Sequence, residues 1–100
     1  MFDAQVVIQQ MGGAGKLQAM IGAKNFIQSQ KDNYLQFQYM TGAKNKANRL
    51  RITLNAKDLY DVEFFVVRKG EKIVKEAFED VWNDQLIKLF EDSTSLYLSF

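Results

Sequence analysis

Basic side chains are the residues of this chain with the clearest chemical potential. Between Lys44 and Arg51 the sequence holds four basic residues and no acidic one, with amides such as Asn45 and Asn48 among them. Lysine and arginine at this density, beside amides that can hydrogen-bond, are typical of contacts to phosphate. The sequence therefore predicts a nucleic-acid-binding surface that comprises Lys24, Lys44, Lys46, Arg49 and Arg51.

Carboxylates offer an alternative binding surface. Residues 1–57 hold eight Lys or Arg against two acids, whereas residues 58–100 hold ten acids against five Lys or Arg. Such asymmetry can mark elements that neutralise each other or a surface for a charged partner, and it would also permit self-association into a homo-oligomer. The alternative prediction is an inhibitor that binds a host defence protein sterically or as a DNA mimic, through Asp58, Asp61, Glu63, Glu79, Asp80 and Asp84.

Two of these carboxylates also bear on catalysis. Asp61 and Glu63 should point the same way from one strand, an arrangement that suits a hard cation or hydrolysis in principle. Beside Arg49 and Arg51 on the neighbouring strand, cross-strand ion pairs are the simpler interpretation.

The residue types on which most catalysis depends are missing. The chain has no cysteine and no histidine, which excludes thiolate nucleophiles, zinc thiolates and the commonest general base. The segment Gly-Gly-Ala-Gly-Lys at 12–16 lacks the spacing, the following Ser or Thr, and the strand-to-helix order of a phosphate-binding loop. We therefore expect a protein that is not an enzyme, with no metal and no cofactor.

The elements that must position these residues follow from hydrophobic periodicity. A helix is expected after a cap at Asp3, and Gly12 should end it. Alternation predicts a strand over residues 16–21, a hairpin of residues 26–29 and 34–40, and strands over residues 49–55 and 59–67. A spacing of 3.6 predicts one long helix over residues 72–92, and residues 96–98 should form an edge strand or a strap.

These elements make one α+β domain over residues 1–100, in the order α-β-β-β-β-α. The antiparallel sheet is expected to be covered on one face by helices, as in a two-layer sandwich, which leaves the other face free for a partner. The side chains expected to face the core are Leu35, Phe37, Tyr39, Leu50, Ile52, Leu54, Tyr60, Val62, Phe64 and Val66.

A short repeat links two distant segments. Residues 18–25 and 38–45 share six of eight positions, including Gly-Ala-Lys-Asn in both copies. Glycine and asparagine tolerate the left-handed conformation that turns require. We expect two similar corners that lie near each other at one rim of the sheet.

Several blocks of the sequence resemble a known group of proteins. They are residues 22–26, 46–48, 52–55, 58–64, 84–86 and 96–99. Together they resemble uncharacterised small proteins of tailed bacteriophages, prophages and related mobile elements. The resemblance implies expression inside a bacterium and no particular activity. It would place a glycine where this chain has Ser95.

The expected location is the cytoplasm of the bacterial host. Residues 1–3 read Met-Phe-Asp, without the basic and apolar regions of a signal peptide. No apolar run approaches the length of a membrane span, so we expect no membrane contact and a partner that is nucleic acid or a host protein.

Overall fold

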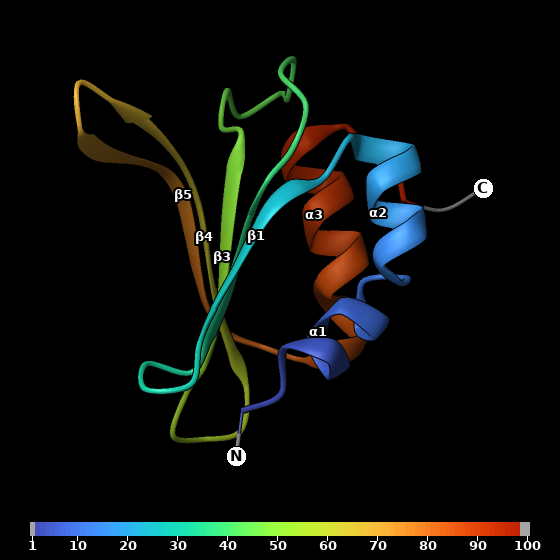
Figure 1. Cartoon of the computed structure of the whole chain (residues 1–100), viewed down its shortest axis with the longest axis vertical. Coiled ribbons are helices and arrows are strands. Elements are labelled where there is room, and N and C mark those ends of the chain that lie inside the picture. The colour runs from blue at the N-terminus through green and yellow to red at the C-terminus, as the bar shows by residue number, and fades with distance from the viewer. Residues whose placement is uncertain (1, 99–100) are drawn as a thin grey trace.

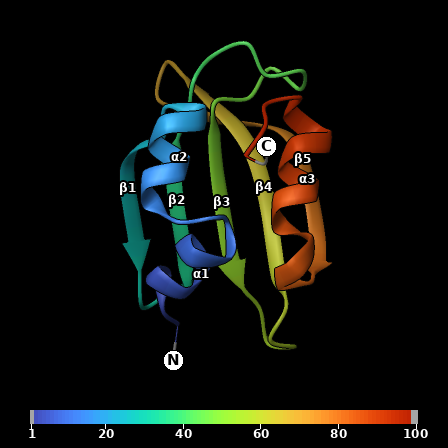
Figure 2. The ribbon, with the colours of Figure 1, turned by 90° about the vertical axis from the view of Figure 1, so that its right-hand side faces the viewer.

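An antiparallel sheet of five strands, in the order β1-β2-β3-β4-β5, carries three α-helices on one of its faces (Figures 1 and 2). The computed structural model describes residues 2–98. The fold class is therefore α+β, as the sequence predicts, although one predicted strand is a helix and the strand β5 was not predicted. The elements are α1 (Ala4–Gln10), α2 (Ala14–Ile21), β1 (Lys24–Ser29), β2 (Tyr34–Gln38), β3 (Arg49–Leu54), β4 (Tyr60–Arg68), β5 (Glu71–Val81), the 3-10 helix η1 (Asn83–Gln85) and α3 (Leu86–Thr94).

The alternation in β2, β3 and β4 produces the buried face of the sheet. Leu35 lies opposite Ile52 and Phe37 lies opposite Leu50, and all four side chains are buried beneath the helices. Successive side chains of a strand point to opposite faces, so the intervening polar residues lie on the uncovered face. The expected inward residues are confirmed apart from two. Leu54 is half-buried against the core, and Val66 is buried outside the core cluster, because the pairing of β4 with β5 shifts after Phe64.

The first helix begins and ends where the sequence indicates. The carboxylate of Asp3 accepts a hydrogen bond from the backbone N–H of Gln5 at 2.9 Å, which satisfies one of the free donors at the N-terminus of α1. Gly12 and Gly13 follow with φ of 108° and 98°, values that favour glycine and end the helix.

The prediction of a strand over residues 16–21 is wrong, because these residues lie in helix α2. Leu17 and Ile21 are fully buried, while Ala19 between them is exposed. A buried pair four residues apart is the spacing of one helix face. The apparent alternation of Leu17, Ala19 and Ile21 arose because alanine is tolerated on either side of a surface helix.

The prediction of one helix over residues 72–92 is wrong for its first half. Residues Glu71–Val81 form β5, the antiparallel partner of β4, and only Leu86–Thr94 form a helix, α3. Leu86, which the spacing placed on the apolar side of that helix, is buried, and Leu89 is half-buried against the core, so this part of the prediction holds. Phe90, which the spacing left out, is buried as well.

Irregular pairing of β5 explains that error. Tyr60 and Val62, two residues apart on β4, lie opposite Val81 and Phe78, which are three apart on β5, and Asp80 in the longer step has φ of 57°. Such a bulge adds one residue to a strand, so side chains three apart share a face. A second shift occurs further along the same pair of strands. Two bulges therefore give β5 a spacing that imitates a helix.

The last helix ends without a glycine. Ser95 adopts the left-handed conformation, with φ of 59°, and its N–H donates to the carbonyl of Glu91 at 2.9 Å. The chain then crosses the core as a strap, because Leu98 is fully buried and its N–H donates to a carboxylate oxygen of Glu91 at 2.8 Å. Residues 96–98 are thus the strap rather than an edge strand.

Candidate functional site

Strand directions bring most of the predicted basic residues to one end of the sheet, which we call the basic end. β1 and β3 begin there, and the loop of residues 41–48 joins β2 to β3. Register pairs Gln38 with both Lys24 and Arg49, so these two cations flank the end of β2. β4 ends at the same place, since Arg49 lies opposite Phe65. The residues gathered at the basic end are Lys24, Lys44, Lys46, Arg49 and one that the sequence did not single out, Arg68.

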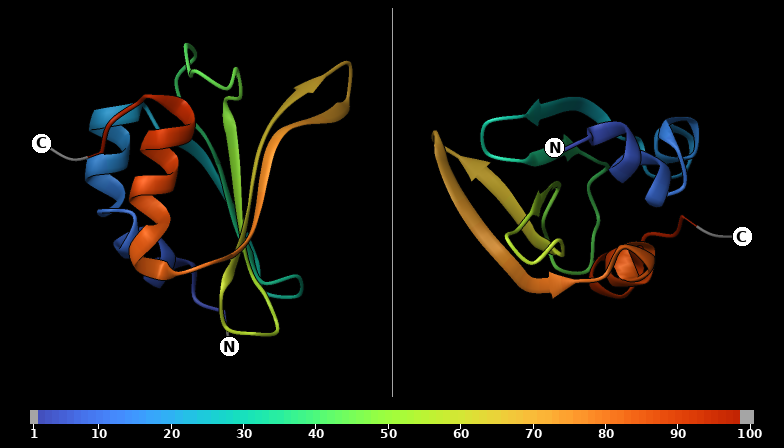
Figure 3. Two further views of the ribbon diagram at one scale, coloured as in Figure 1. Left: turned by 180° about the vertical axis from the view of Figure 1, so that it is seen from behind. Right: turned by 90° about the horizontal axis from the view of Figure 1, so that it is seen from below.

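Arg68 joins this group because β4 and β5 continue beyond the other strands. The last pairing of β3 with β4 is Arg49 with Phe65, whereas β4 and β5 pair as far as Arg68 with Glu71. The resulting two-stranded hairpin bends away from the helices (Figure 3). The apolar run of residues 64–67 ends before Arg68 and Lys69, so no local pattern in the sequence placed Arg68 on a strand.

The loop of residues 41–48 has a defined conformation. The amide oxygen of Asn45 accepts from the N–H of Ala47 at 3.1 Å, and its amide nitrogen donates to the carboxylate of Glu76 on β5 at 3.1 Å. The N–H of Lys44 donates to the carbonyl of Thr94 at the end of α3, at 2.7 Å. These contacts tie the loop to β5 and to α3, so the basic residues do not depend on a free loop for their positions.

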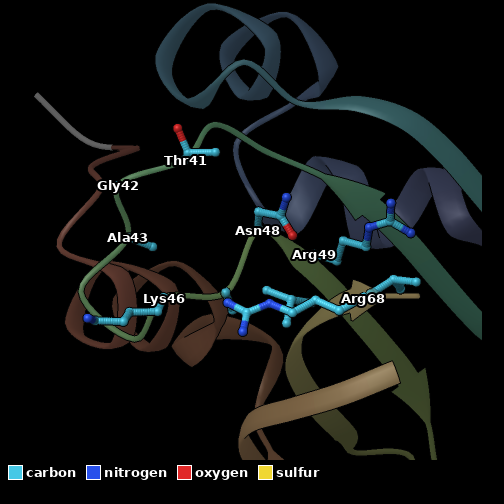
Figure 4. A pocket seen from close by; sticks show the side chains of 10 residues that line it. Thr41, Gly42, Ala43, Lys46, Asn48, Arg49 and Arg68 are labelled. Atoms are coloured by element: carbon cyan, nitrogen blue, oxygen red, sulfur yellow. The ribbon is translucent and has the colours of Figure 1, made fainter. Parts of the chain in front are cut away.

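A cavity of about 480 Å³ lies between this loop and the end of β4 (Figure 4). Its cations are Lys46, Arg49 and Arg68, and no acidic side chain is among the described residues that form its wall. Aliphatic side chains form the rest of one side. The full lining is Thr41, Gly42, Ala43, Lys46, Ala47, Asn48, Arg49, Val66, Val67 and Arg68.

Two buried polar atoms at this cavity lack a hydrogen-bond partner. They are the Nε of Arg49 and the amide oxygen of Asn48. Buried polar groups are nearly always paired, and each one left unpaired costs about 1–3 kcal/mol. Because both atoms are almost inaccessible to solvent, they add a cost to the fold rather than contact points for a ligand in the open cavity.

The three cations of the cavity extend in different directions. In Figure 4 the side chains of Lys46 and Arg49 extend in opposite directions, and the side chain of Arg68 lies between them. Arg49 also forms the wall of a neighbouring cavity of about 260 Å³, with Gln36 and Gln38 of β2. Positive charge therefore forms a row across the cavity rather than a cluster around one point.

Arg51 lies on the uncovered face, where its guanidinium already has partners. Its Nε and Nη2 donate to the amide oxygen of Gln36 at 2.9 and 2.7 Å, and its guanidinium carbon lies 4.2 Å from the ring centre of Tyr34. Phe65, an aromatic residue of the same face, is only 2 % exposed. The charges of Arg51 and Lys72 lie 5.9 and 4.9 Å from the centre of its ring.

The expected ion pairs between these arginines and the acids of β4 do not form among the described residues. Glu63 lies opposite Arg51 in register, but its carboxylate pairs with the ammonium of Lys72 at 2.6 Å. Asp61 accepts from the amide of Asn55 at 3.0 Å instead. The prediction of cross-strand pairs is wrong because Lys72, brought close by β5, competes for Glu63.

Lys44 lies apart from the main cavity. It forms the wall of a separate cavity of about 590 Å³ between β5 and α3, where Lys75, Glu76 and Asp92 are its charged neighbours. Its charge is at the basic end, but acids partly offset it. The predicted basic set therefore does not converge. Lys46 and Arg49 line the cavity, Lys24 lies across β2 from Arg49, and Lys44 and Arg51 lie elsewhere.

Most of the predicted acidic set lies at the opposite end of the sheet. Asp58 is in the turn between β3 and β4, and Glu79, Asp80 and Asp84 lie at or just beyond the end of β5. Asp61 is near the start of β4, while Glu63 lies in the middle of the uncovered face. Most of the predicted basic residues and most of the predicted acidic residues thus lie at opposite ends of the sheet. We call the end with Asp58, Glu79, Asp80 and Asp84 the acidic end.

Two of these acids are occupied by internal contacts. The amide nitrogen of Asn55 donates to Asp61 at 3.0 Å and to Asp80 at 2.9 Å, so it bridges the two carboxylates. The ammonium of Lys57 pairs with Asp80 at 2.9 Å, and this contact lowers the pKa of Asp80 and raises that of Lys57. These contacts hold the turn in place.

The two copies of Gly-Ala-Lys-Asn lie side by side, as expected. The N–H of Met40, two residues before the second copy, donates at 2.9 Å to the carbonyl of Ile21, the residue before the first copy. Gly22 and Gly42 both have positive φ, of 65° and 99°. The first copy follows helix α2, whereas the second follows strand β2. The two copies therefore share only the backbone conformation of a turn that begins at glycine.

Comparison with known proteins identifies no relative: none of the family models, curated proteins and solved structures matches the chain. The resemblance to small phage proteins therefore stays a prediction, as does self-association. Within residues 2–98, no three Asp or Glu side chains lie where they could together hold a metal ion. No helix in that part of the chain has the length and apolar character that crossing a membrane demands.

Proposed function

We propose that this protein is a non-enzymatic accessory protein that binds nucleic acid through its basic end. The supporting observation is the cavity between the loop of residues 41–48 and the end of β4, with three cations and no acid in its described wall. Phosphates are the anions that Lys and Arg bind most readily at such sites, because each contact releases a condensed counterion. The guanidinium of Arg68 also offers a fork of donors that fits phosphate geometry.

The arrangement of the cations favours a polymer over a small anion. A single phosphate is bound best by cations that converge on one point, whereas Lys46 and Arg49 extend in opposite directions on either side of Arg68 (Figure 4). Lys24 extends the same row along the end of β2. A chain of successive phosphates can contact all of these cations at once.

The test is a fluorescence anisotropy titration of a labelled oligonucleotide at about 50 and about 200 mM salt. The variant carries Lys46→Glu and Arg68→Glu. Its matched control carries Lys31→Glu and Lys88→Glu, the same change of charge at two exposed lysines outside the basic end.

We expect the Lys46→Glu, Arg68→Glu variant to bind at least about tenfold more weakly at the lower salt. The slope of log Kd against log salt should also fall by about 0.7–0.9 for each lost phosphate contact. The control should bind as the wild type does. Equal weakening in both variants would mean that only net charge matters, and it would overturn the proposal.

The alternative, an inhibitor of a host protein, would use the acidic end. It is supported by the gathering of Asp58, Glu79 and Asp84 as exposed carboxylates at one end. Asp61 and Asp80 support it less, because Asn55 already bridges them. Asp58→Asn with Asp84→Asn should abolish capture of a host protein if that end binds one, and should leave oligonucleotide binding intact.

A further inference from the structure

We propose that the cavity of the basic end receives one unstacked nucleotide of a single strand, so that the protein prefers single-stranded over duplex nucleic acid. This inference rests on the proposed function and specifies its ligand. The cavity measures about 480 Å³, within the range of about 300–1,000 Å³ that is usual for sites of small molecules. A base that is paired and stacked in a duplex cannot enter such a space, whereas a base in a single strand is free to turn out.

One wall of the cavity suits the face of a base. Val67 of β4 is its most exposed aliphatic residue, and the less exposed Val66, Ala43 and Ala47 lie beside it. Thr41 and Asn48 add polar side chains to the lining. A phosphate ion alone would not use this aliphatic wall.

The cations then fit the phosphates on the two sides of the inserted nucleotide. Lys46 extends to one side of the cavity and Arg49 to the other, with Arg68 between them (Figure 4). A strand that crosses the cavity would place its phosphates along this row.

The uncovered sheet face is a less suitable place for bases to stack. Phe65 is shielded beneath Arg51 and Lys72, and the guanidinium of Arg51 already lies over the ring of Tyr34. Stacking there would require these contacts to open. The cavity needs no such rearrangement, so it is the better site for a base.

Val67→Phe tests the inference, because it fills the cavity without changing any charge. Val67 is 39 % exposed and lies in the cavity wall, so a larger side chain should be tolerated by the fold. Val74→Phe is the matched control, since Val74 of β5 is 45 % exposed and does not line the cavity. Thr41→Phe fills the same space from the loop and serves as a second variant, and circular dichroism verifies that each protein is folded.

The measurement is binding of one labelled oligonucleotide as a single strand and as a duplex. We expect the wild type to bind the single strand about tenfold more tightly than the duplex, and both filling variants to lose that difference through weaker binding of the single strand. Val74→Phe should behave as the wild type does. Thymidine 5′-phosphate should compete only at far higher concentration than the strand.

Separate outcomes overturn the two proposals. If the filling variants bind the single strand normally while Lys46→Glu with Arg68→Glu does not, the nucleotide pocket is wrong and the basic interface stands. If the wild type binds neither form of the oligonucleotide, the proposed function fails as well. Competition by thymidine 5′-phosphate at the same concentration as the strand would show a mononucleotide site and overturn the polymer as ligand.

Discussion

The backbone N–H of Asn48 donates to the carbonyl of Phe65 at 3.3 Å, and this bond brings the start of β3 beside the last third of β4. Asn48 precedes Arg49, and Phe65 is followed by the residues that lead to Arg68. Two cations nineteen positions apart in the sequence thereby come to line the same cavity. The physical basis of the candidate site is this junction between a loop and a strand that continues beyond its neighbours.

Replacing Asn48 by leucine should stabilise the fold. The side chain has nearly the same size, and the substitution removes a buried acceptor that has no partner. We expect the free energy of unfolding to rise by about 1 kcal/mol in urea titrations, because the desolvation cost of that oxygen disappears. A loss of stability would contradict the assignment of the oxygen as unpaired.

Two buried tyrosines should respond differently to loss of the hydroxyl. The hydroxyl of Tyr39 is buried without a partner, and burial together with the nearby charge of Glu76 raises its pKa. Tyr60, by contrast, donates to the amide oxygen of Gln10 at 2.8 Å. Tyr39→Phe should leave stability unchanged or raise it, while Tyr60→Phe should lower it by about 1 kcal/mol. Thermal or urea unfolding of both variants measures the difference.

Arg51 should contribute more to stability than to binding, although the sequence groups it with the phosphate ligands. Its guanidinium is bonded to Gln36 and packed against Tyr34, and it covers Phe65. Arg51→Ala should cost on the order of 1–2 kcal/mol of unfolding free energy, since it removes these bonds and exposes an aromatic ring. Its effect on oligonucleotide affinity should be smaller than that of Arg68→Ala, measured in the same titration. The reverse order would shift the binding surface to the sheet face.

The contact between Lys57 and Asp80 predicts a dependence of stability on pH. The folded pKa of Asp80 lies below its unfolded value, so the stability it adds is present above about pH 4 and is lost as the pH falls through the folded pKa. Lys57→Met removes the hydrogen bond that is the main cause of the shift. The stability difference between wild type and variant should therefore be largest near neutral pH and should shrink below about pH 4. Urea unfolding of both proteins at several pH values from neutral to below about pH 4 measures whether this difference shrinks.

The end of α3 offers a stabilising change. Ser95 has φ of 59°, a conformation that costs a residue with a Cβ but not glycine. Ser95→Gly should raise the free energy of unfolding by about 0.5–1 kcal/mol. Gly70, at φ of 77° in the hairpin tip, is the reverse control, since Gly70→Ser should lower stability. Urea unfolding curves of both variants measure these two changes in stability, and a loss of stability in Ser95→Gly would contradict the prediction.

Sequence patterns located the elements whose signals are local. Asp3 caps α1 through a bond that spans two residues, and the alternation around Leu35 and Leu50 places those side chains in the core. Sequence patterns gave the wrong element where the backbone departs from regular geometry. A bulge at Asp80 spaced Phe78 and Val81 as a helix would, so the pattern named the wrong element for most of β5.

The amino-acid sequence by itself determined that the protein is α+β with an antiparallel sheet, that helices cover one face, and that its Lys and Arg are concentrated before residue 58. It did so because side-chain alternation and capping depend on neighbours along the chain. Only the tertiary structure decided that Arg68 lines a cavity with Lys46 and Arg49, and that Arg51 is bound to Gln36. Those relationships depend on strand register and on how far a hairpin continues past its neighbours, which no local pattern specifies.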